Sequence, residues 1–487
     1  MNEPKVTNNN GKHKLKRSLI HLAVRNNLLR GSIISLIQKR MWRTLVEKNA
    51  GKFPHKVQMD KNDIAKALFQ STDRNIRKKL ISKQWLEKFA DIHIENLETQ
   101  AQKMRETKER IGFEPPLFIT ISPTKKCNLR CPGCYACSST DTRDKLDIET
   151  FDRILTEQLE RWGSYITVIS GGEPFLWEDK GKDLLDMAKK HHRHFFMVYT
   201  NGTLIDKSMA KRLEQLGNVT PAISIEGYEK ETDQRRGKGV YKKILEAFDN
   251  LREVGVPFGI SITAMKQNWE LVSSEDFLDY WFNQECATYG WIFQFMPIGD
   301  RSSFDMVVPP EQRMVMLKRL WEVIREKKLF LADFWNSGTA TSGCIAGGRP
   351  GGYFYVTWSG DITPCVFVPY SETNIYDIYK NGGTLDDVIL TPMMQQIREW
   401  QASYGFTLYH SFEEECDAKN WLAPCFFRDH YNEFLEVANT CTLKPIDPGA
   451  EEALTSGNYH KMMLQYGNDF EHINSPFWNR NYLMIGK

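Results

Sequence analysis

Three cysteines are grouped in one short segment of this 487-residue chain. Within "CNLRCPGC" (127–134), Cys127, Cys131 and Cys134 are separated first by three residues and then by two. A closed structural zinc site takes four ligands, commonly as two Cys-x-x-Cys pairs. Three thiolates on a cubane iron–sulfur cluster instead leave one iron open to a small molecule. The spacing favours an open cluster over a zinc loop, and Pro132 and Gly133 suit a tight loop whose amides donate to cluster sulfurs.

A second group of cysteines lies in the C-terminal third of the chain. Its members are Cys344, Cys365, Cys416, Cys425 and Cys441. The stretch "YFYVTWSGDITPCVF" (353–367) predicts a β-hairpin with "SGD" as its turn, which would bring Cys344 close to Cys365. The chain has ten cysteines and no recognisable export signal, which argues against a disulfide framework and for metal ligation or redox chemistry. Buried free cysteines are the alternative for this second group.

The Cys-x3-Cys-x2-Cys motif directly after the apolar run "LFITIS" resembles the radical S-adenosylmethionine (SAM) superfamily. The resemblance implies that Cys127, Cys131 and Cys134 are catalytic and hold a 4Fe–4S cluster whose open iron chelates SAM. It implies that an electron from the cluster cleaves SAM to methionine and a 5′-deoxyadenosyl radical, which abstracts hydrogen from an unactivated carbon. It also implies an electron donor such as flavodoxin or ferredoxin as a partner.

One position departs from the family pattern. The family usually has an aromatic residue just before the third cysteine, and here that position is Gly133. Tyr135, which follows the third cysteine, is the candidate to flank the adenine of SAM. Cys137 is interpreted as a bystander in the loop.

The remaining SAM contacts are expected in motifs that follow successive strands. The resemblance assigns "GGEP" (171–174) to the amino group of SAM, with Glu173 accepting a charged bond or orienting the loop. Arg236 is the candidate partner for the SAM carboxylate, because a guanidinium fork suits a carboxylate, with Arg235 as the alternative. The backbone of "MPIG" (296–299) is a candidate for contact with adenine. Turn-forming or solvated loop residues are the alternative for each. The expected cofactor-binding residues are Tyr135, Gly171, Gly172, Glu173, Pro174, Asn201, Ser224, Glu226 and Arg236, with Ser224 and Glu226 as ribose contacts.

The C-terminal cysteines resemble the SPASM and twitch extensions, which carry auxiliary 4Fe–4S clusters. The tight cysteine run of the full seven-cysteine SPASM pattern is absent, so we expect one auxiliary cluster of the twitch type. The expected ligands are Cys344, Cys365, Cys416 and Cys425, with Cys441 as the alternative fourth ligand.

Strand and helix patterns alternate from about residue 117 and must position these motifs. Apolar, β-branched runs predict strands at 118–122, 165–170, 195–200, 221–227, 257–265 and 291–299, with helices such as 147–162 between them. This alternation predicts an α/β fold, a partial (β/α)6 TIM-like barrel with a parallel sheet, and ligands at the carboxyl ends of its strands. The motifs fall at those ends. "HHRH" (191–194) is interpreted as a solvated connection, not a metal site.

The predicted organisation has five parts. They are a basic helical N-terminal region (1–110), the barrel (111–308), a helical linker (309–340), the auxiliary-cluster extension (341–445) and a C-terminal tail (446–487). The first 50 residues carry eleven Lys or Arg and two acidic residues in an amphipathic pattern. Such a pattern binds a membrane surface or a partner, or packs on the barrel with a solvated basic face.

The net charge of +2 gives no indication of nucleic-acid binding. No membrane span is expected, so a cytoplasmic protein is predicted, with a peripheral position at the inner membrane face left open. The basic N-terminus favours a lipid or membrane-borne substrate and C–C bond formation. A peptide- or protein-modifying maturase is the alternative, and an iron–sulfur electron-transfer or scaffold protein without SAM chemistry is the alternative of another class.

Overall fold

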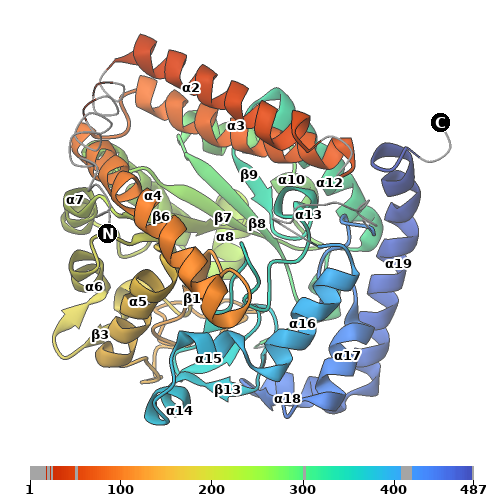
Figure 1. The fold of residues 1–487 in the computed structure, drawn as a ribbon. Coiled ribbons are helices and arrows are strands. Elements are labelled where there is room, and N and C mark those ends of the chain that lie inside the picture. Colours follow the sequence, from red (N-terminus) through yellow and green to blue (C-terminus); the bar gives the residue numbers. More distant parts are fainter. Residues whose placement is uncertain are drawn as a thin grey trace, which may run out of the picture.

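A ten-stranded sheet forms the centre of the molecule, with the strand order β13-β11-β10-β1-β2-β5-β6-β7-β8-β9. The computed structural model describes Ser18, Leu22 and residues 26–49, 53–299, 303–406 and 419–484. The six parallel strands predicted from the sequence are adjacent in this sheet, which confirms the α/β partial-barrel prediction (Figure 1). They are β1 (Phe118–Ile121), β2 (Ile166–Ile169), β5 (Phe195–Thr200), β6 (Val219–Ile225), β7 (Gly259–Ala264) and β8 (Tyr289–Gln294).

Helices between these strands cover the outer face of the sheet. The first, α5 (Ile148–Trp162), begins where the Asp147 side chain accepts a bond of 2.8 Å from Thr150 N, and ends at Gly163 with φ 69°. Its apolar face buries Phe151 and Ile154 completely against the sheet. The others are α6 (Leu184–Lys190), α7 (Lys207–Leu216), α8 (Glu229–Arg236), α9 (Val240–Val254), α10 (Trp269–Val272), α11 (Glu275–Asp279) and the π-helix η3 (Tyr280–Gln284).

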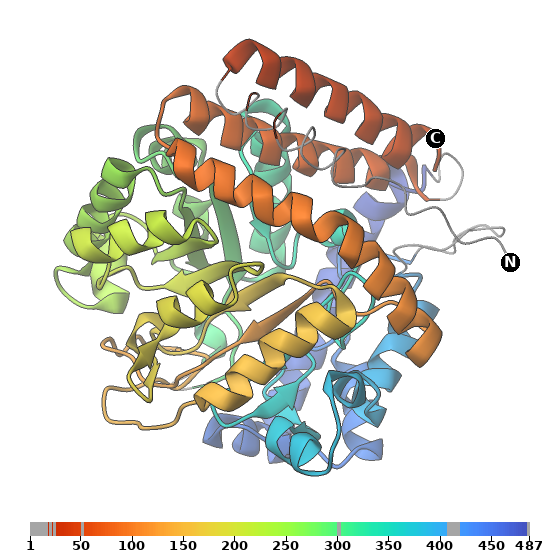
Figure 2. The same cartoon turned by 60° about the vertical axis from the view of Figure 1, so that its left-hand side comes forward.

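The long helix α4 (Lys83–Ile111) lies across the end of the barrel where the strands begin (Figure 2). It contacts the glycines that end the outer helices. A Cβ on Gly163 would lie 2.8 Å from Gln100 Cα, and one on Gly217 would lie 2.7 Å from Lys88 Cβ. Phe89 of α4 packs edge-on against Phe195, the first residue of β5, at 5.2 Å. The end where the strands finish is therefore the end left for the sequence motifs.

Two further N-terminal helices, α2 (Asn27–Trp42) and α3 (His55–Arg77), pack together beside the barrel, with the short π-helix η1 (Arg43–Glu47) between them in the chain. Arg30 of α2 pairs with Asp73 of α3 at 2.5 Å. On α2, Leu28 is 86% and Leu36 68% exposed. Within the described residues, none of the helices is long and apolar enough to cross a membrane.

The C-terminal extension lengthens the sheet at both edges. After α12 (Pro310–Glu326), β9 (Leu331–Asp333) pairs parallel with β8, and β10 (Tyr355–Val356) pairs parallel with β1. β10 and β11 (Asp361–Thr363) form the predicted antiparallel hairpin, whose turn contains Gly360 with φ 79°. The edge strand beyond is β13 (Thr373–Asn374).

Helices complete the C-terminal extension. They are α13 (Gly338–Thr341), α14 (Ile375–Lys380), α15 (Leu385–Ile389), α16 (Pro392–Ser403), α17 (Tyr431–Thr440), α18 (Pro448–Thr455) and α19 (Gly457–Asn481). Minor elements are the strand pairs β3 (Glu178–Asp179) with β4 (Lys182–Asp183) and β12 (Tyr370–Ser371) with β14 (Lys444–Pro445), and the 3₁₀ turns η2 (Pro174–Leu176) and η4 (Phe304–Met306).

The HHRH segment differs from its interpretation as a solvated connection. His194 is fully buried, and burial lowers the pKa of its imidazole to about 3. Its ring contacts Thr167 Oγ1 at 3.2 Å, while His191 contacts Asp152 at 2.8 Å. The sequence shows four adjacent polar residues, but the backbone turns one of them inward against the sheet.

Candidate functional site

Cys127, Cys131 and Cys134 lie in the loop that follows β1, close enough to influence one another electrostatically. Burial raises the pKa of the Cys127 thiol to about 12 and also raises that of Cys131. The Cys127 sulfur accepts hydrogen bonds from Leu129 N at 3.4 Å and from Asn201 Nδ2 at 3.8 Å. Thiolates are therefore unfavourable here until a metal stabilises them.

The GGEP segment after β2 is held against the cysteine loop by its backbone. Gly172 N donates to Thr124 O at 2.9 Å, and Glu173 N donates to Lys126 O at 2.8 Å. A Cβ on Gly172 would lie 2.2 Å from Lys126 O. Only glycine fits at this position, because any side chain would push apart the loop that carries the first cysteine.

The Glu173 carboxylate connects two strand ends. It is fully buried and accepts hydrogen bonds from Asn201 N at 2.8 Å, Thr200 Oγ1 at 2.7 Å and Phe175 N at 3.2 Å. Burial raises the pKa of this carboxyl to about 7, although the three donors oppose the rise. Both oxygens are thus used to orient the loops, with the buried Pro174 beginning the turn η2.

Asn201, at the end of β5, links this network to the first cysteine. Its Nδ2 donates to Asn128 Oδ1 at 2.8 Å as well as contacting Cys127, and its Oδ1 accepts from Thr203 N at 2.9 Å. The structure brings Asn201 to the cysteine loop, as expected from its position after a strand.

A buried carboxylate with two arginines lies on the other side of the cysteine loop. Glu226 Oε1 accepts from Arg235 Nη1 at 2.5 Å and from Arg236 Nε and Nη2 at 2.9 and 2.5 Å. Glu226 Oε2 is buried and has no partner within the described residues. Arg235 also reaches Pro132 O at 3.3 Å, and both guanidinium groups oppose the rise in the pKa of Cys131.

The other predicted SAM contacts lie around the same strand ends. Ser224 is half-buried on β6, opposite Ser261 of β7. The Tyr135 hydroxyl accepts a bond from Gly171 N at 3.1 Å, and its ring contacts Phe367 at 6.2 Å. Within "MPIG", a Cβ on Gly299 would lie 2.4 Å from Cys134 O, so this segment abuts the third cysteine.

Phe295 is a site residue that the sequence interpretation missed. A Cβ on Gly133 would lie 2.5 Å from Phe295 Cε2, so this buried ring fills the space over the glycine that replaces the usual aromatic residue. The signal was an aromatic residue directly before "MPIG", in a motif already expected at the site.

The structure brings three of the C-terminal cysteines together. Cys344, Cys365 and Cys425 are electrostatic neighbours, and burial raises the pKa of Cys365 and of Cys425. The sulfurs of Cys365 and Cys425 accept hydrogen bonds from backbone amides. Tyr353 Oη lies 2.9 Å from Cys365 Sγ, Phe367 N lies 3.5 Å from the same sulfur, and Arg428 N lies 3.3 Å from Cys425 Sγ.

The remaining cysteines are placed differently. Cys441 accepts from Gln396 Nε2 at 3.4 Å, and its pKa is raised by burial and by Glu372. Cys137 N donates to Cys134 O at 3.2 Å, and Cys137 has φ 47°. Cys416 lies outside the described residues.

The donor sets fit iron–sulfur clusters and SAM. Within the described residues, no three His, Cys, Asp or Glu side chains are arranged to hold a single metal ion. A cubane places each thiolate on a separate iron, so its ligands do not converge on one point. N–H donors aimed at the sulfurs suit an anionic cluster, and the unpaired Glu226 oxygen offers an acceptor to a ligand that carries hydroxyl or ammonium donors.

Comparisons with known proteins agree with this geometry. Residues 121–278 match the family model of the radical SAM superfamily. The chain is 34% identical over 152 residues to Fe-coproporphyrin III synthase of Methanosarcina barkeri, covering 31% of this chain but only 37% of that enzyme. It is 28% identical over 305 residues to the mycofactocin maturase MftC of Mycolicibacterium smegmatis, covering 60% of this chain and 75% of the maturase.

Among solved structures, Streptococcus suis SuiB bound to the precursor peptide SuiA is similar, with a TM-score of 0.50 and 18% identity. The match covers 67% of this chain and 75% of SuiB, which establishes a likeness of fold. The cysteine motif, the strand-end network and the second set of thiols occur together on this fold. Residues 121–278 thus form a radical SAM domain, of a family whose cofactors are SAM and a 4Fe–4S cluster, and the part that follows is similar to C-terminal extensions of the SPASM/twitch type.

Proposed function

We propose that this enzyme reductively cleaves SAM and abstracts hydrogen from an unactivated carbon of a peptide substrate, with Cys127, Cys131 and Cys134 as the ligands of the SAM-binding cluster. When bound by these thiols, the cluster would supply the electron for SAM cleavage, and an external reductant such as flavodoxin or ferredoxin would return an electron to the cluster. The observation that carries the proposal is the arrangement of these thiols beside a buried carboxylate with one unpaired oxygen.

The protein's own residues position the loops around the cysteines, offset charge at the thiols and leave one end of the barrel for the substrate. Gly171 and Gly172 let the GGEP backbone approach the segment that leads into the cysteine loop, and Glu173 fixes the loops on either side. Arg235 and Arg236 offset the negative charge at Cys131. With α4 across the far end of the barrel, the motif-bearing end is the expected route for substrate.

A peptide substrate is supported by the likeness to the mycofactocin maturase, which extends over 60% of this chain. The basic N-terminus alone favours a lipid or membrane-borne substrate instead. However, α2 and α3 pack on each other and α3 packs on the extension, so much of this region serves the fold. The peptide alternative is therefore preferred to the lipid hypothesis.

A tetrapyrrole is the second candidate substrate, and a cluster of aromatic rings beside the third cysteine favours it. Phe367 contacts Tyr135 at 6.2 Å, Phe293 at 5.7 Å and Trp335 at 4.7 Å. Trp335 is fully buried, and the other three rings are half-buried, which suits contact with a flat aromatic ligand. The similarity to the Fe-coproporphyrin III synthase, at 34% identity, points to the same class of substrate.

The test is iron and sulfide content together with anaerobic SAM cleavage, for the wild type and for a variant with Ala at 127, 131 and 134. We expect about eight irons and 5′-deoxyadenosine from the wild type, and about four irons and no 5′-deoxyadenosine from the variant. Zinc in place of iron, or iron without SAM cleavage, would contradict the proposal. Mass spectrometry of candidate precursor peptides and of iron coproporphyrin III after turnover then separates the two substrate classes.

A further inference from the structure

Arg428 is a fully buried cation whose donors are unused. The residue is 1% exposed, and Nε, Nη1 and Nη2 have no hydrogen-bond partner within the described residues. Burying a charged group without hydrogen bonds is costly, so such a group normally has an acceptor close by. The planar group is held by two aromatic rings, with its centre 4.5 Å from the ring of Trp335 and 5.3 Å from that of Tyr466.

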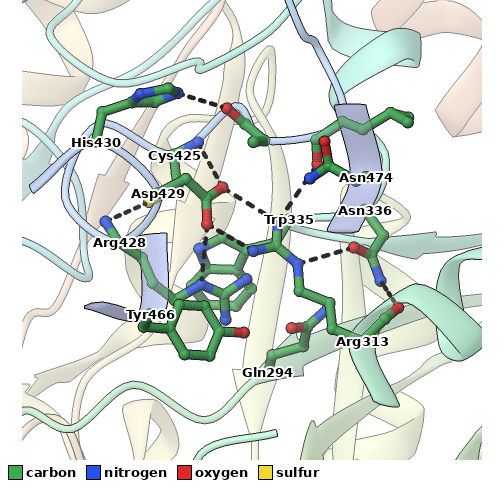
Figure 3. Close-up of polar contacts among 12 residues, drawn as sticks. Gln294, Arg313, Trp335, Asn336, Cys425, Arg428, Asp429, His430, Tyr466 and Asn474 are labelled. Atoms are coloured by element: carbon green, nitrogen blue, oxygen red, sulfur yellow. Dashed lines mark hydrogen bonds and ion pairs between the residues drawn. The ribbon is translucent and has the colours of Figure 1, made fainter. Parts of the chain in front are cut away.

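The neighbouring carboxylate does not satisfy Arg428, because another arginine already occupies it. Arg313 donates to Asp429 Oδ1 at 2.5 Å and to Oδ2 at 3.1 Å (Figure 3). Cys425 N also donates to Asp429 Oδ2 at 3.0 Å. Arg428 Nε lies 3.6 Å from Oδ1, beyond hydrogen-bonding distance. One carboxylate therefore faces two guanidinium groups. Arg313 is hydrogen-bonded to it, and Arg428 keeps its donors unused.

Arg428 belongs to the same turn as Cys425. Arg428 N donates to the Cys425 sulfur at 3.3 Å, and Asp429 N donates to Cys425 O at 2.9 Å. The charge on Arg428 is among the interactions felt by the Cys425 thiol. The spare positive charge thus lies at the second set of thiols, where a cluster would bring several negative charges.

We propose that the Arg428 guanidinium is the counter-charge of the auxiliary 4Fe–4S cluster and sets its reduction potential. The inference rests on the auxiliary cluster assigned to Cys344, Cys365 and Cys425. Reduction adds one negative charge to the cluster, and a nearby buried cation stabilises that state, so Arg428 raises the potential. Because an arginine stays charged at any accessible pH, the effect does not depend on pH.

The experiment is a redox titration of the holoenzyme followed by electron paramagnetic resonance, repeated in the 127/131/134 alanine variant to isolate the auxiliary signal. Arg428→Met is expected to lower the equilibrium constant for reduction of the auxiliary cluster at least tenfold. For a one-electron couple this lowers the reduction potential by about 59 mV. Arg428→Lys keeps the charge and should shift it less. Arg398→Met is the matched control, because Arg398 is a half-buried arginine of the same extension, over Phe113 at 4.4 Å.

An unchanged potential in Arg428→Met with full iron content overturns the inference. If instead that variant leaves the potential unchanged and weakens substrate binding, Arg428 is a substrate anchor. If Arg428→Met loses the second cluster but Arg428→Lys retains its iron, the result supports the role of the positive charge. If both variants lose the second cluster, the inference is overturned. A wild type without the second set of about four irons would refute the auxiliary cluster itself, which is a different result.

Discussion

The two sets of thiols have the same kinds of neighbours in different arrangements. Each lies beside a buried carboxylate that two arginines approach. At the first set, both arginines bond to one oxygen of Glu226 and leave the other oxygen unpaired. At the second, Arg313 takes both oxygens of Asp429 and leaves Arg428 with unused donors. The first site thus offers an acceptor and the second offers donors.

The difference matches two kinds of occupant. A spare acceptor suits a ligand with hydroxyl and ammonium groups, as SAM has, in addition to the cluster. A spare cation suits a site that must only neutralise a cluster. The predictions below separate the two sites, starting with the largest expected effect.

The sharpest separation comes from single cysteine replacements. Cys131→Ala should abolish 5′-deoxyadenosine formation, because the SAM-binding cluster loses one of three ligands. Cys365→Ala should retain part of this activity while losing about four irons. Chromatographic measurement of 5′-deoxyadenosine, with iron analysis, checks both. Cys137→Ala is the control and should retain activity; the opposite pattern would reverse the assignment of the two sets.

Removing the charge of Glu226 should disturb the first site alone. Glu226→Gln leaves two buried guanidinium groups without their anion, and breaking such a pair costs about 3–5 kcal/mol. We expect lower stability and weaker SAM binding, measured by thermal unfolding and by equilibrium dialysis. Glu229→Gln, an exposed change in the same segment, should have little effect. Normal SAM affinity in Glu226→Gln would show that the unpaired oxygen does not face the ligand.

Gly172→Ala tests how closely the GGEP segment holds the first cysteine loop. The added Cβ would lie 2.2 Å from Lys126 O, so the loops must separate, at a cost of about 1–3 kcal/mol. Iron bound at the first site should decrease while the second cluster is retained. Gly457→Ala, where a Cβ meets nothing within 4 Å, is the matched control. Equal iron content in both variants would show that the contact is not needed.

Mild acid should weaken the barrel, which holds the first set of thiols, through the buried His194. The pKa of this buried imidazole is about 3 in the folded protein, against an ordinary value of 6.5 in the unfolded chain, so between these values only the unfolded chain gains the proton. Stability is complete above pH 6.5 and falls below it, by about 1.4 kcal/mol at pH 5.5. His194→Gln should show a flatter pH profile of the unfolding temperature than exposed His192→Gln. Parallel profiles would contradict the prediction.

Much of the first site could be predicted because its signals are local. The three cysteines lie within eight residues, and each partner motif directly follows a strand whose apolar pattern is clear. The parallel sheet then brings those strand ends together. The exception is Phe295, since its place directly before "MPIG" was visible in the sequence but its contact with Gly133 across the barrel was not.

The second site was harder because its ligands come from separate segments. The hairpin that carries Cys365 was predicted from its turn, but its pairing with β1 depends on the tertiary fold. The pair Arg313–Asp429 joins α12 to the turn after Cys425, and nothing in either segment indicates the other. Burial of His194 was missed for the same reason, since polarity of a segment does not reveal which side chain faces the sheet.

The pairing of β1 with β10 also constrains the order of folding during synthesis. Thr120 pairs with Tyr355, so the edge of the barrel is completed only after most of the chain has been made. Until β9 and β10 arrive, β8 and β1 present unpaired edges, and such edges pair readily with other chains. The extension that holds the second set of thiols therefore also protects the nascent barrel from aggregation. A chain that stops after β8 should accordingly be insoluble, even though it contains every motif of the first site.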